Sequence, residues 1–145
     1  IQNGKEMKRR IVLGGNKLQA GDYYRKNGVV VGVMINESQY ISLSDQASSY
    51  VSYSSATSLQ SSYSIQGITG WRMPTKDECE VIHSNEPIIS KALSSVGTVL
   101  QKDWYWTSTY GNMGYGSGYY AYNFENGGYW APGSSNCVRL IHDVD

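Results

Sequence analysis

The sequence predicts an α+β domain built from short, mostly antiparallel strands, two small helices and long loops. Three observations predict this fold class: an early β-hairpin signature, two helix-start signals in the middle of the chain, and alternating aromatic segments in its last third. The length of 145 residues suits one domain. We therefore expect a single domain over residues 11–145, and we assign the basic residues 1–10 to a linker from an upstream region.

The first expected elements are a hairpin and a short strand. Asn27-Gly28 is a pair that tolerates positive φ at both turn positions, and β-branched residues follow it, so residues 22–35 are typical of a hairpin. Residues 39–43 are expected to add one strand. Of the 23 residues in 42–64, 11 are serine. We expect this stretch to be a long surface excursion with about one helical turn, partly packed through its tyrosines.

Two helices are expected in the middle of the chain. Thr75 followed by Glu78 is a capping box, and it predicts a short helix over residues 76–83. Ser84 or Asn85 then caps a second helix that ends at Gly97. Its apolar residues recur at helical spacing and are expected in the core: Ile88, Ile89, Ala92, Leu93 and Val96.

The last third reads as strands and loops. Strands are expected over residues 104–109, over 119–125 and, after the turn Asn126-Gly127-Gly128, over 129–131. Residues 137–144 are mostly apolar, and we expect one central, buried strand there.

Four motifs in this order resemble a bacterial extracellular family. They are Gly70-Trp71-Arg72-Met73-Pro74-Thr75, Tyr105-Trp106-Thr107-Ser108-Thr109, Tyr120-Ala121-Tyr122-Asn123-Phe124 and Val138-Arg139-Leu140-Ile141. The family is that of the C-terminal domains of collagen-like adhesins, found also at the ends of fimbrillin-like surface proteins. The resemblance implies a C-type-lectin-like fold, shared distantly with formylglycine-generating enzymes and with the variable proteins of diversity-generating retroelements. It also implies an extracellular or cell-surface location.

The same motifs have a structural interpretation. Trp71 can bury a large face while its indole N–H finds a partner, and Arg72 can fork onto a carboxylate or carbonyls. Pro74 ends the preceding strand. We therefore expect Trp71, Arg72 and Pro74 to belong to the scaffold.

Composition and spacing exclude several function classes. Lys and Arg together number 12, as do Asp and Glu, so the formal charge is zero and gives no basic excess for nucleic acid. No apolar run is long enough to span a membrane in this fragment. His83 and His142 are the only histidines, and we expect no metal, no cofactor and no catalytic residue.

The resemblance raises two further activities that this sequence does not match. The formylglycine-generating relatives need two close cysteines near the C-terminus, whereas here Cys137 stands alone and Cys79 lies far upstream. A calcium-dependent sugar site would need Glu-Pro-Asn or Gln-Pro-Asp together with Trp-Asn-Asp, and neither combination occurs. Whether the two cysteines form a disulfide or stay as thiols is left open by the sequence.

Binding is the function that composition favours. Residues 104–136 hold seven Tyr, seven Gly, four Asn, four Ser and three Trp, with Glu125 as the only charged residue. Antibody binding loops have this composition, because Tyr and Trp give contact area at low entropic cost. We expect a glycan or surface-protein ligand to bind at eight loop positions: Tyr110, Asn112, Tyr115, Ser117, Tyr119, Asn126, Tyr129 and Trp130.

Three alternatives stay open at this point. The tyrosine-rich loops could cover their own core, or the domain could be a structural cap or assembly module of a fimbrial subunit that contacts only its neighbours, such as the upstream domain of the same polypeptide. Retroelement mutagenesis of Asn codons yields Asn, Tyr, Ser, Asp and Gly, four of which dominate residues 104–136. The same composition also arises without such a system.

Overall fold

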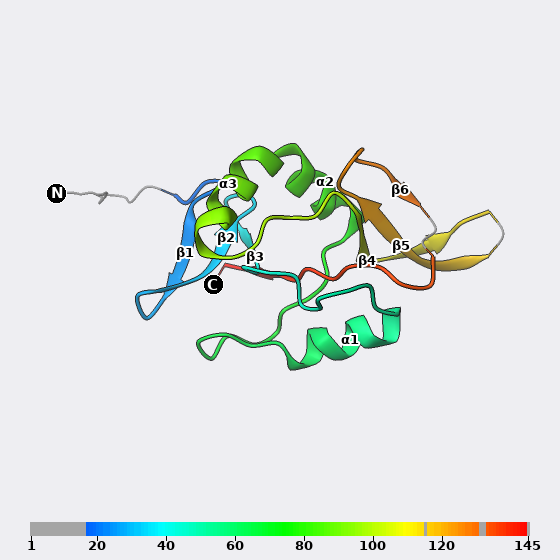
Figure 1. Ribbon diagram of the computed structural model, residues 1–145, viewed down its shortest axis with the longest axis horizontal. Helices are drawn as coiled ribbons and strands as arrows, with labels where there is room; N and C mark the ends of the chain where they lie inside the picture. The colour runs from blue at the N-terminus through cyan, green and yellow to red at the C-terminus, as the bar shows by residue number, and fades with distance from the viewer. Residues whose placement is uncertain (1–16, 115, 131–132, 145) are drawn as a thin grey trace.

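The computed structural model describes residues 17–114, 116–130 and 133–144 (Figure 1). These residues form an α+β fold with two antiparallel sheets and three helices, as the sequence predicts in class. The elements in chain order are β1 (Tyr23–Lys26), β2 (Val29–Met34), β3 (Gln39–Ile41), α1 (Tyr53–Ser62), α2 (Lys76–Ser84), α3 (Glu86–Val96), β4 (Trp104–Asn112), β5 (Ser117–Asn123), β6 (Tyr129–Trp130) and β7 (Ile141–Asp143).

The first sheet has the strand order β1-β2-β3-β7. Its opening hairpin is confirmed: Asn27 and Gly28 have φ values of 54° and 78°, which is the turn geometry that matches the twist of the strands. β3 confirms the short strand expected after the hairpin, and it pairs with β7 from the C-terminal end. Val31, Val33 and Ile41 are buried, so this sheet supplies much of the core.

The second sheet has the strand order β4-β5-β6. β4 extends three residues beyond the strand expected over 104–109, because Tyr110, Gly111 and Asn112 continue the ladder against β5. The register shifts between Trp106 and Tyr110, so β4 carries a bulge before its last three paired residues. The β4–β5 hairpin projects beyond the body of the molecule, at the right of Figure 1.

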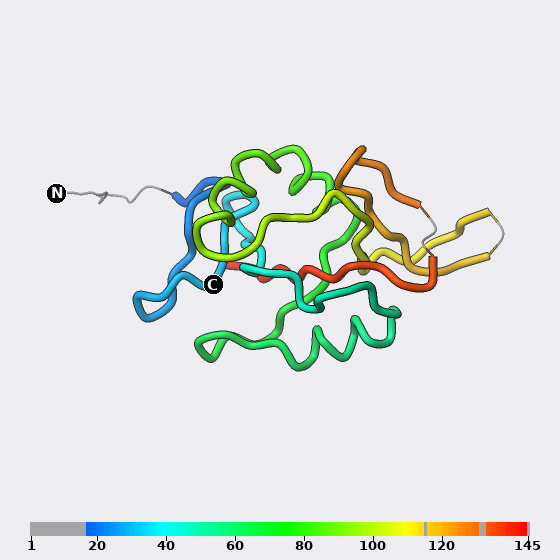
Figure 2. The backbone as a smooth tube through the Cα atoms, viewed as in Figure 1, coloured from blue at the N-terminus to red at the C-terminus, as the bar shows by residue number. Residues whose placement is uncertain are grey.

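The C-terminal segment joins the two sheets. Cys137 exchanges backbone hydrogen bonds with Trp104 and Trp106 of β4, and Ile141 exchanges them with Arg72. The chain from 137 to 143, red in Figure 2, runs between α1 below it and α2 and α3 above it. Burial is confirmed for residues 137–141, but the prediction of one continuous, central strand over 137–144 is wrong, because β7 covers only three residues and lies at the edge of its sheet. Regular pairing is limited to β7, since the Leu140 N–H is donated to the side chain of Gln46 and not to a neighbouring strand.

α2 and α3 cover one side of the sheets and confirm the two predicted helices. The capping box of α2 is present in both directions between Thr75 and Glu78. Ile89 and Leu93 of α3 are fully buried, and Ala92 and Val96 pack against the same core. Ile88 is 56% exposed, so its expected place in the core is wrong. Ile88, the first residue of the set, falls outside the buried stripe because that stripe follows Ile89 and Leu93.

α1 lies on the opposite side, below the sheets in Figure 1, in the stretch where about one helical turn was expected. The serine-rich stretch forms ten residues of helix, not about one turn. Ser52 caps it by accepting a hydrogen bond from the N–H of Ser55, and only Ala56 is buried. Neither Gly nor Pro occurs between residues 43 and 66, so nothing in the backbone opposes a helix there.

Candidate functional site

The register of the second sheet decides which predicted site residues lie together. Side chains directly opposite in a ladder share a face, and residues two apart along a strand share it too. Tyr110 opposes Tyr119, Asn112 opposes Ser117, and Trp130 opposes Ala121, two residues along β5 from Tyr119. Five predicted residues therefore share one face, which we call the aromatic face: Tyr110, Asn112, Ser117, Tyr119 and Trp130.

These positions are exposed. Seven of the eight predicted residues fall in the described parts of the chain, and all seven are exposed. They were expected in loops, whereas the structure has six of them in strands and only Asn126 in a turn. A strand holds a side chain more firmly than a loop, which lowers the entropy lost when that side chain binds a ligand. Tyr115 lies outside the described residues.

Two further rings, Tyr53 and Trp106, pack against the aromatic face on the side of α1. Tyr53 of α1 stacks on Tyr119 with ring centroids 3.9 Å apart and planes 11° apart, and it meets the edge of Trp106 at 5.0 Å. Trp106 is 5% exposed and donates its indole N–H to the Val51 carbonyl at 2.8 Å. Burial raises the pKa of Tyr53 to about 12, and the neighbouring Tyr119 adds to the rise. The Tyr53 hydroxyl is therefore neutral throughout the physiological range.

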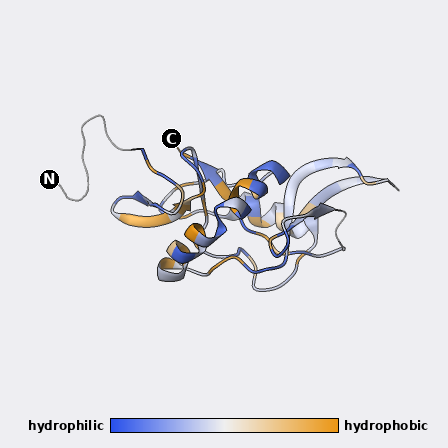
Figure 3. Cartoon of the chain, turned by 90° about the horizontal axis from the view of Figure 1, so that it is seen from above, coloured by the Kyte–Doolittle hydropathy of each residue, from blue (hydrophilic) through white to orange (hydrophobic). Residues whose placement is uncertain are grey.

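A polar pair lies beside the rings at the tip of the hairpin. Asn112 and Ser117 oppose each other one step beyond the Tyr110–Tyr119 pair. The Asn112 Oδ1 accepts the Gly114 N–H at 2.7 Å, which orients the amide of this exposed residue. β4 and β5 are pale in Figure 3, between hydrophilic and hydrophobic, as uncharged Tyr, Gly, Ser and Asn would give. The face thus combines flat rings with neutral hydrogen-bonding groups.

Tyr129 does not belong to the aromatic face. It opposes Tyr122, which is buried in the core on the other side of the sheet. Its ring meets the edge of Tyr120 at 5.3 Å, and the Lys76 ammonium lies 4.3 Å from its centroid. The grouping of Tyr129 with Trp130 is therefore wrong in geometry, because adjacent strand residues point to opposite faces.

Asn126 also lies apart. It sits in the turn that follows β5, at the other end of that strand from the hairpin tip, and its Oδ1 accepts the Gly128 N–H at 2.9 Å. A Cβ at Gly127 would meet the His83 ring at 2.9 Å, so this turn packs against the end of α2. Asn126 shapes a turn, and the structure does not bring it to the aromatic face.

The motif residues expected in the scaffold are there. Trp71 is 2% exposed and donates its indole N–H to Ile68 at 3.1 Å. Arg72 forks onto both oxygens of Glu78 at 2.8 and 2.9 Å and reaches Asp143 at 3.1 Å. Burial alone would raise the pKa of Glu78, but hydrogen bonds from Arg72, from the Thr75 N–H and from Gln39 lower it to about 2. This cluster ties the start of α2 to the C-terminal segment.

A second polar cluster lies in the interior of the protein, around Arg139 and Asp45. Arg139 is 2% exposed, and its guanidinium contacts Asp45 at 3.0 Å and the carbonyls of Ser42 and Thr98. The Tyr105 hydroxyl and the Gln101 amide also donate to Asp45. The carboxylate is thus fully occupied inside the protein, and its role is structural.

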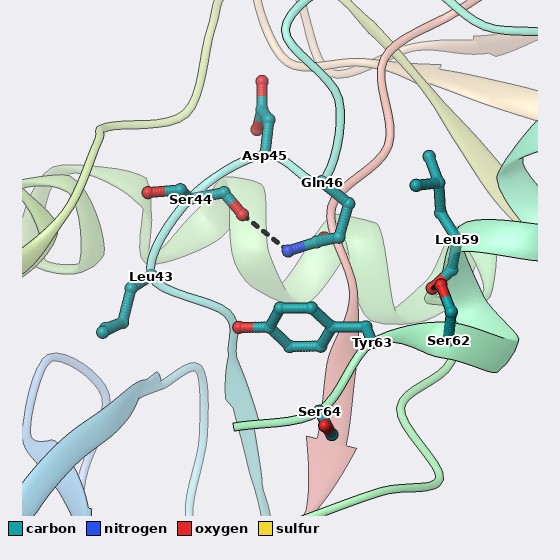
Figure 4. Close-up of a pocket in the computed structure, with 8 residues that line it drawn as sticks. All are labelled: Leu43, Ser44, Asp45, Gln46, Leu59, Ser62, Tyr63 and Ser64. Carbon is teal, nitrogen blue, oxygen red and sulfur yellow. Dashed lines mark hydrogen bonds between the residues drawn. The ribbon is translucent and has the colours of Figure 1, made fainter. Parts of the chain in front are cut away.

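An open hollow lies beside this cluster, and Asp45 is among the residues that line it. It has a volume of about 390 Å³ between the 43–46 segment and the end of α1. Figure 4 shows Tyr63 across the hollow and the Asp45 side chain directed away from it. Its lining residues are Leu43, Ser44, Asp45, Gln46, Leu59, Ser62, Tyr63 and Ser64, and none of them is a predicted site residue.

The described residues do not gather a cluster of metal ligands. No group of three His, Cys, Asp or Glu side chains among them could hold a metal ion. Cys79 and Cys137 are both free and buried. Burial raises the pKa of the Cys137 thiol to about 12 and that of Cys79 well above its ordinary value, so neither is an activated nucleophile.

Tyr53 is the functional candidate that sequence reasoning missed. The tyrosines of the serine-rich stretch indicated partial packing, but only the helix brings this residue, more than 60 positions away in sequence, onto Tyr119. A serine cap at Ser52 followed by ten residues without Gly or Pro is the signal that could have predicted the helix that carries Tyr53.

No family model matches this chain, and no curated protein matches it. Within the described residues, the helices are all too short or too polar to cross a membrane.

Proposed function

We propose that this chain is a noncatalytic, extracellular ligand-binding domain of a bacterial surface protein. Its fold would be C-type-lectin-like, and its ligand would be a glycan or a surface protein. The observation that carries the proposal is the aromatic face, where exposed rings are held by strands and are not used by the core. Retroelement diversification of this segment would extend the range of ligands.

Exposure without a structural use is the main support. Tyr110 and Trp130 expose 56% and 54% of their area, although a ring gains free energy by burial. Residues that contribute most to binding interfaces are enriched in Trp and Tyr. The neighbouring Trp106, which the fold does use, is buried and hydrogen bonded. Tyr110 and Trp130 thus present ring area that the core does not use.

The experiment uses the adjacent residues Trp130 and Tyr129 as a matched pair. The labelled domain is applied to arrays of glycans and matrix proteins and to bacterial cells, as wild type, Trp130→Ala and Tyr129→Ala. We expect at least a tenfold loss of binding for Trp130→Ala and less than a twofold loss for Tyr129→Ala, with both variants folded by circular dichroism.

Two results would count against this function. Equal loss in both variants would mean that the two faces of the sheet are not distinguished by the ligand. Binding only to the upstream part of the same polypeptide, with no array or cell signal, would favour the structural cap of a fimbrial subunit.

A further inference from the structure

Two rings of the aromatic face are open to solvent over more than half of their area: Trp130, and Tyr110, whose centroid lies 5.0 Å from that of Tyr119. Tyr53 covers Tyr119, whereas Tyr110 and Trp130 are more than half exposed. Tyr110 pairs with Tyr119 in β5. Trp130 pairs with Ala121, two residues further along β5 and on its other side. Strand spacing and rise therefore separate the two open rings by about 12 Å, the length of a short oligosaccharide.

The area of the exposed rings is small for a protein partner. Tyr110, Tyr119 and Trp130 are 56%, 38% and 54% exposed. Since an aromatic side chain offers about 150–250 Å², the three together present roughly 300 Å². A stable protein interface buries about 800 Å² on each side. The rings could anchor only part of such an interface, whereas they match the flat faces of a few sugar rings.

The polar groups on this face suit a ligand that carries hydroxyl groups and no charge. Asn112 and Ser117 place an amide and a hydroxyl next to the Tyr110 ring, and the members of the face assigned by register include no Lys, Arg, Asp or Glu. A carboxylated or sulfated sugar would call for Arg or Lys. Calcium-mediated binding would call for several carboxylate oxygens.

We propose that the aromatic face binds a short neutral oligosaccharide directly, without calcium. Tyr110 and Trp130 stack on two of its pyranose rings, and Asn112 and Ser117 hydrogen bond to its hydroxyls. Tyr53 is a positioning residue, because it holds Tyr119 and so fixes the spacing of the two open rings. The inference rests on the proposed function and names the ligand class of the same surface.

The test titrates the whole chain with stated probes. The neutral probes are cellotriose, maltotriose, triacetylchitotriose and lactose, with glucose and N-acetylglucosamine as their single rings. The charged probe is 3′-sialyllactose, which matches lactose. Trp fluorescence and calorimetry report binding, with and without EDTA.

We expect at least one neutral trisaccharide to bind about ten times more tightly than its single ring, because it reaches both open rings. Tyr110→Ala and Trp130→Ala should each weaken this binding about tenfold, and Tyr129→Ala less than twofold. EDTA should leave binding unchanged, and sialyllactose should bind no better than lactose. For Tyr53→Ala we expect weaker binding, rescued by Tyr53→Phe, which retains the stacked ring.

Several results would overturn the inference. Loss of binding in EDTA, preference for sialyllactose, or no binding to any neutral probe would each do so. If a protein on the matrix array binds instead and Trp130→Ala abolishes that signal, the proposed function stands and the oligosaccharide falls. If neither kind of ligand depends on Trp130, both fall together.

Discussion

At the scale of single residues, neighbours in sequence have different roles because a strand alternates its faces. Trp130 joins Tyr110 and Tyr119, whereas Tyr129 turns to Lys76 on the other side. Composition pointed to the segment that carries these rings, but it gave no register and so could not separate the two residues. Only the ladder partners Ala121 and Tyr122 assign them to opposite faces.

Substitution of Trp106 should destabilise the fold far more than substitution of Trp130. Trp106→Ala empties a buried, hydrogen-bonded position and should cost about 3–5 kcal/mol, whereas Trp130→Ala removes an exposed ring and should change stability by less than about 0.5 kcal/mol. Urea denaturation measures both. A large loss for Trp130→Ala would show that its ring serves the core and would remove it from the site.

The buried pair Asp45–Arg139 should be costly to break. Asp45→Asn leaves a guanidinium that is 2% exposed without its counter-charge, so we expect a loss of about 3 kcal/mol or more. The matched control is Asp77→Asn, whose partner Lys76 is at the surface and whose own side chain is 83% exposed; it should change stability by less than about 0.5 kcal/mol. Similar small effects in both would mean that the interior cluster does not hold the fold.

At the scale of elements, local chemistry explains which helices were predictable. α2 and α3 carry a capping box, a proline in the first turn and a glycine stop, and all of these signals act within a few residues. α1 has a weak apolar face, with Ala56 alone buried, and is held by contacts that are distant in sequence, at Trp106 and Tyr119. Its pairing with β5 could therefore not be derived from the serine-rich stretch itself.

α1 should depend on Tyr53 for its attachment. Tyr53→Ala removes the stack on Tyr119, so amide hydrogens over residues 54–62 should exchange at least tenfold faster while those of α2 are unchanged. Tyr50→Ala is the control, since Tyr50 is 56% exposed and lies outside the helix. Unchanged exchange in Tyr53→Ala would mean that other contacts attach α1.

The entry to α2 should make the protein sensitive to acid. The pKa of Glu78 is about 2 in the folded protein against an ordinary value of 4.5, so the unfolded chain binds a proton more readily. Its stabilising effect is present above about pH 4.5 and is lost as the pH falls toward 2. Glu78→Gln should be less stable than wild type at pH 7 and should lose less stability over that range, as thermal unfolding at stepped pH would show. Parallel curves for the two proteins would contradict this assignment.

At the scale of the whole molecule, the C-terminal segment holds the aromatic face in place. Cys137 is bonded to β4, Ile141 to Arg72, and β7 to β3, so the second sheet is fixed to the first through one short stretch of chain. The sequence indicated that residues 137–144 are buried, because they are apolar. It could not show that Arg139 and Gln46 would replace part of the regular ladder, since those bonds join residues almost 100 positions apart.

The most direct test of the aromatic face is a ¹⁵N correlation spectrum that resolves the indole N–H groups of the four tryptophans. Either the trisaccharide or the array protein that binds is titrated into the labelled chain. We predict that the Trp130 indole signal shifts progressively, while those of Trp71 and Trp106, which are bonded to Ile68 and Val51, stay in place. A shift of the Trp71 signal with Trp130 unmoved would place the ligand elsewhere and contradict the assignment of the aromatic face as the binding surface.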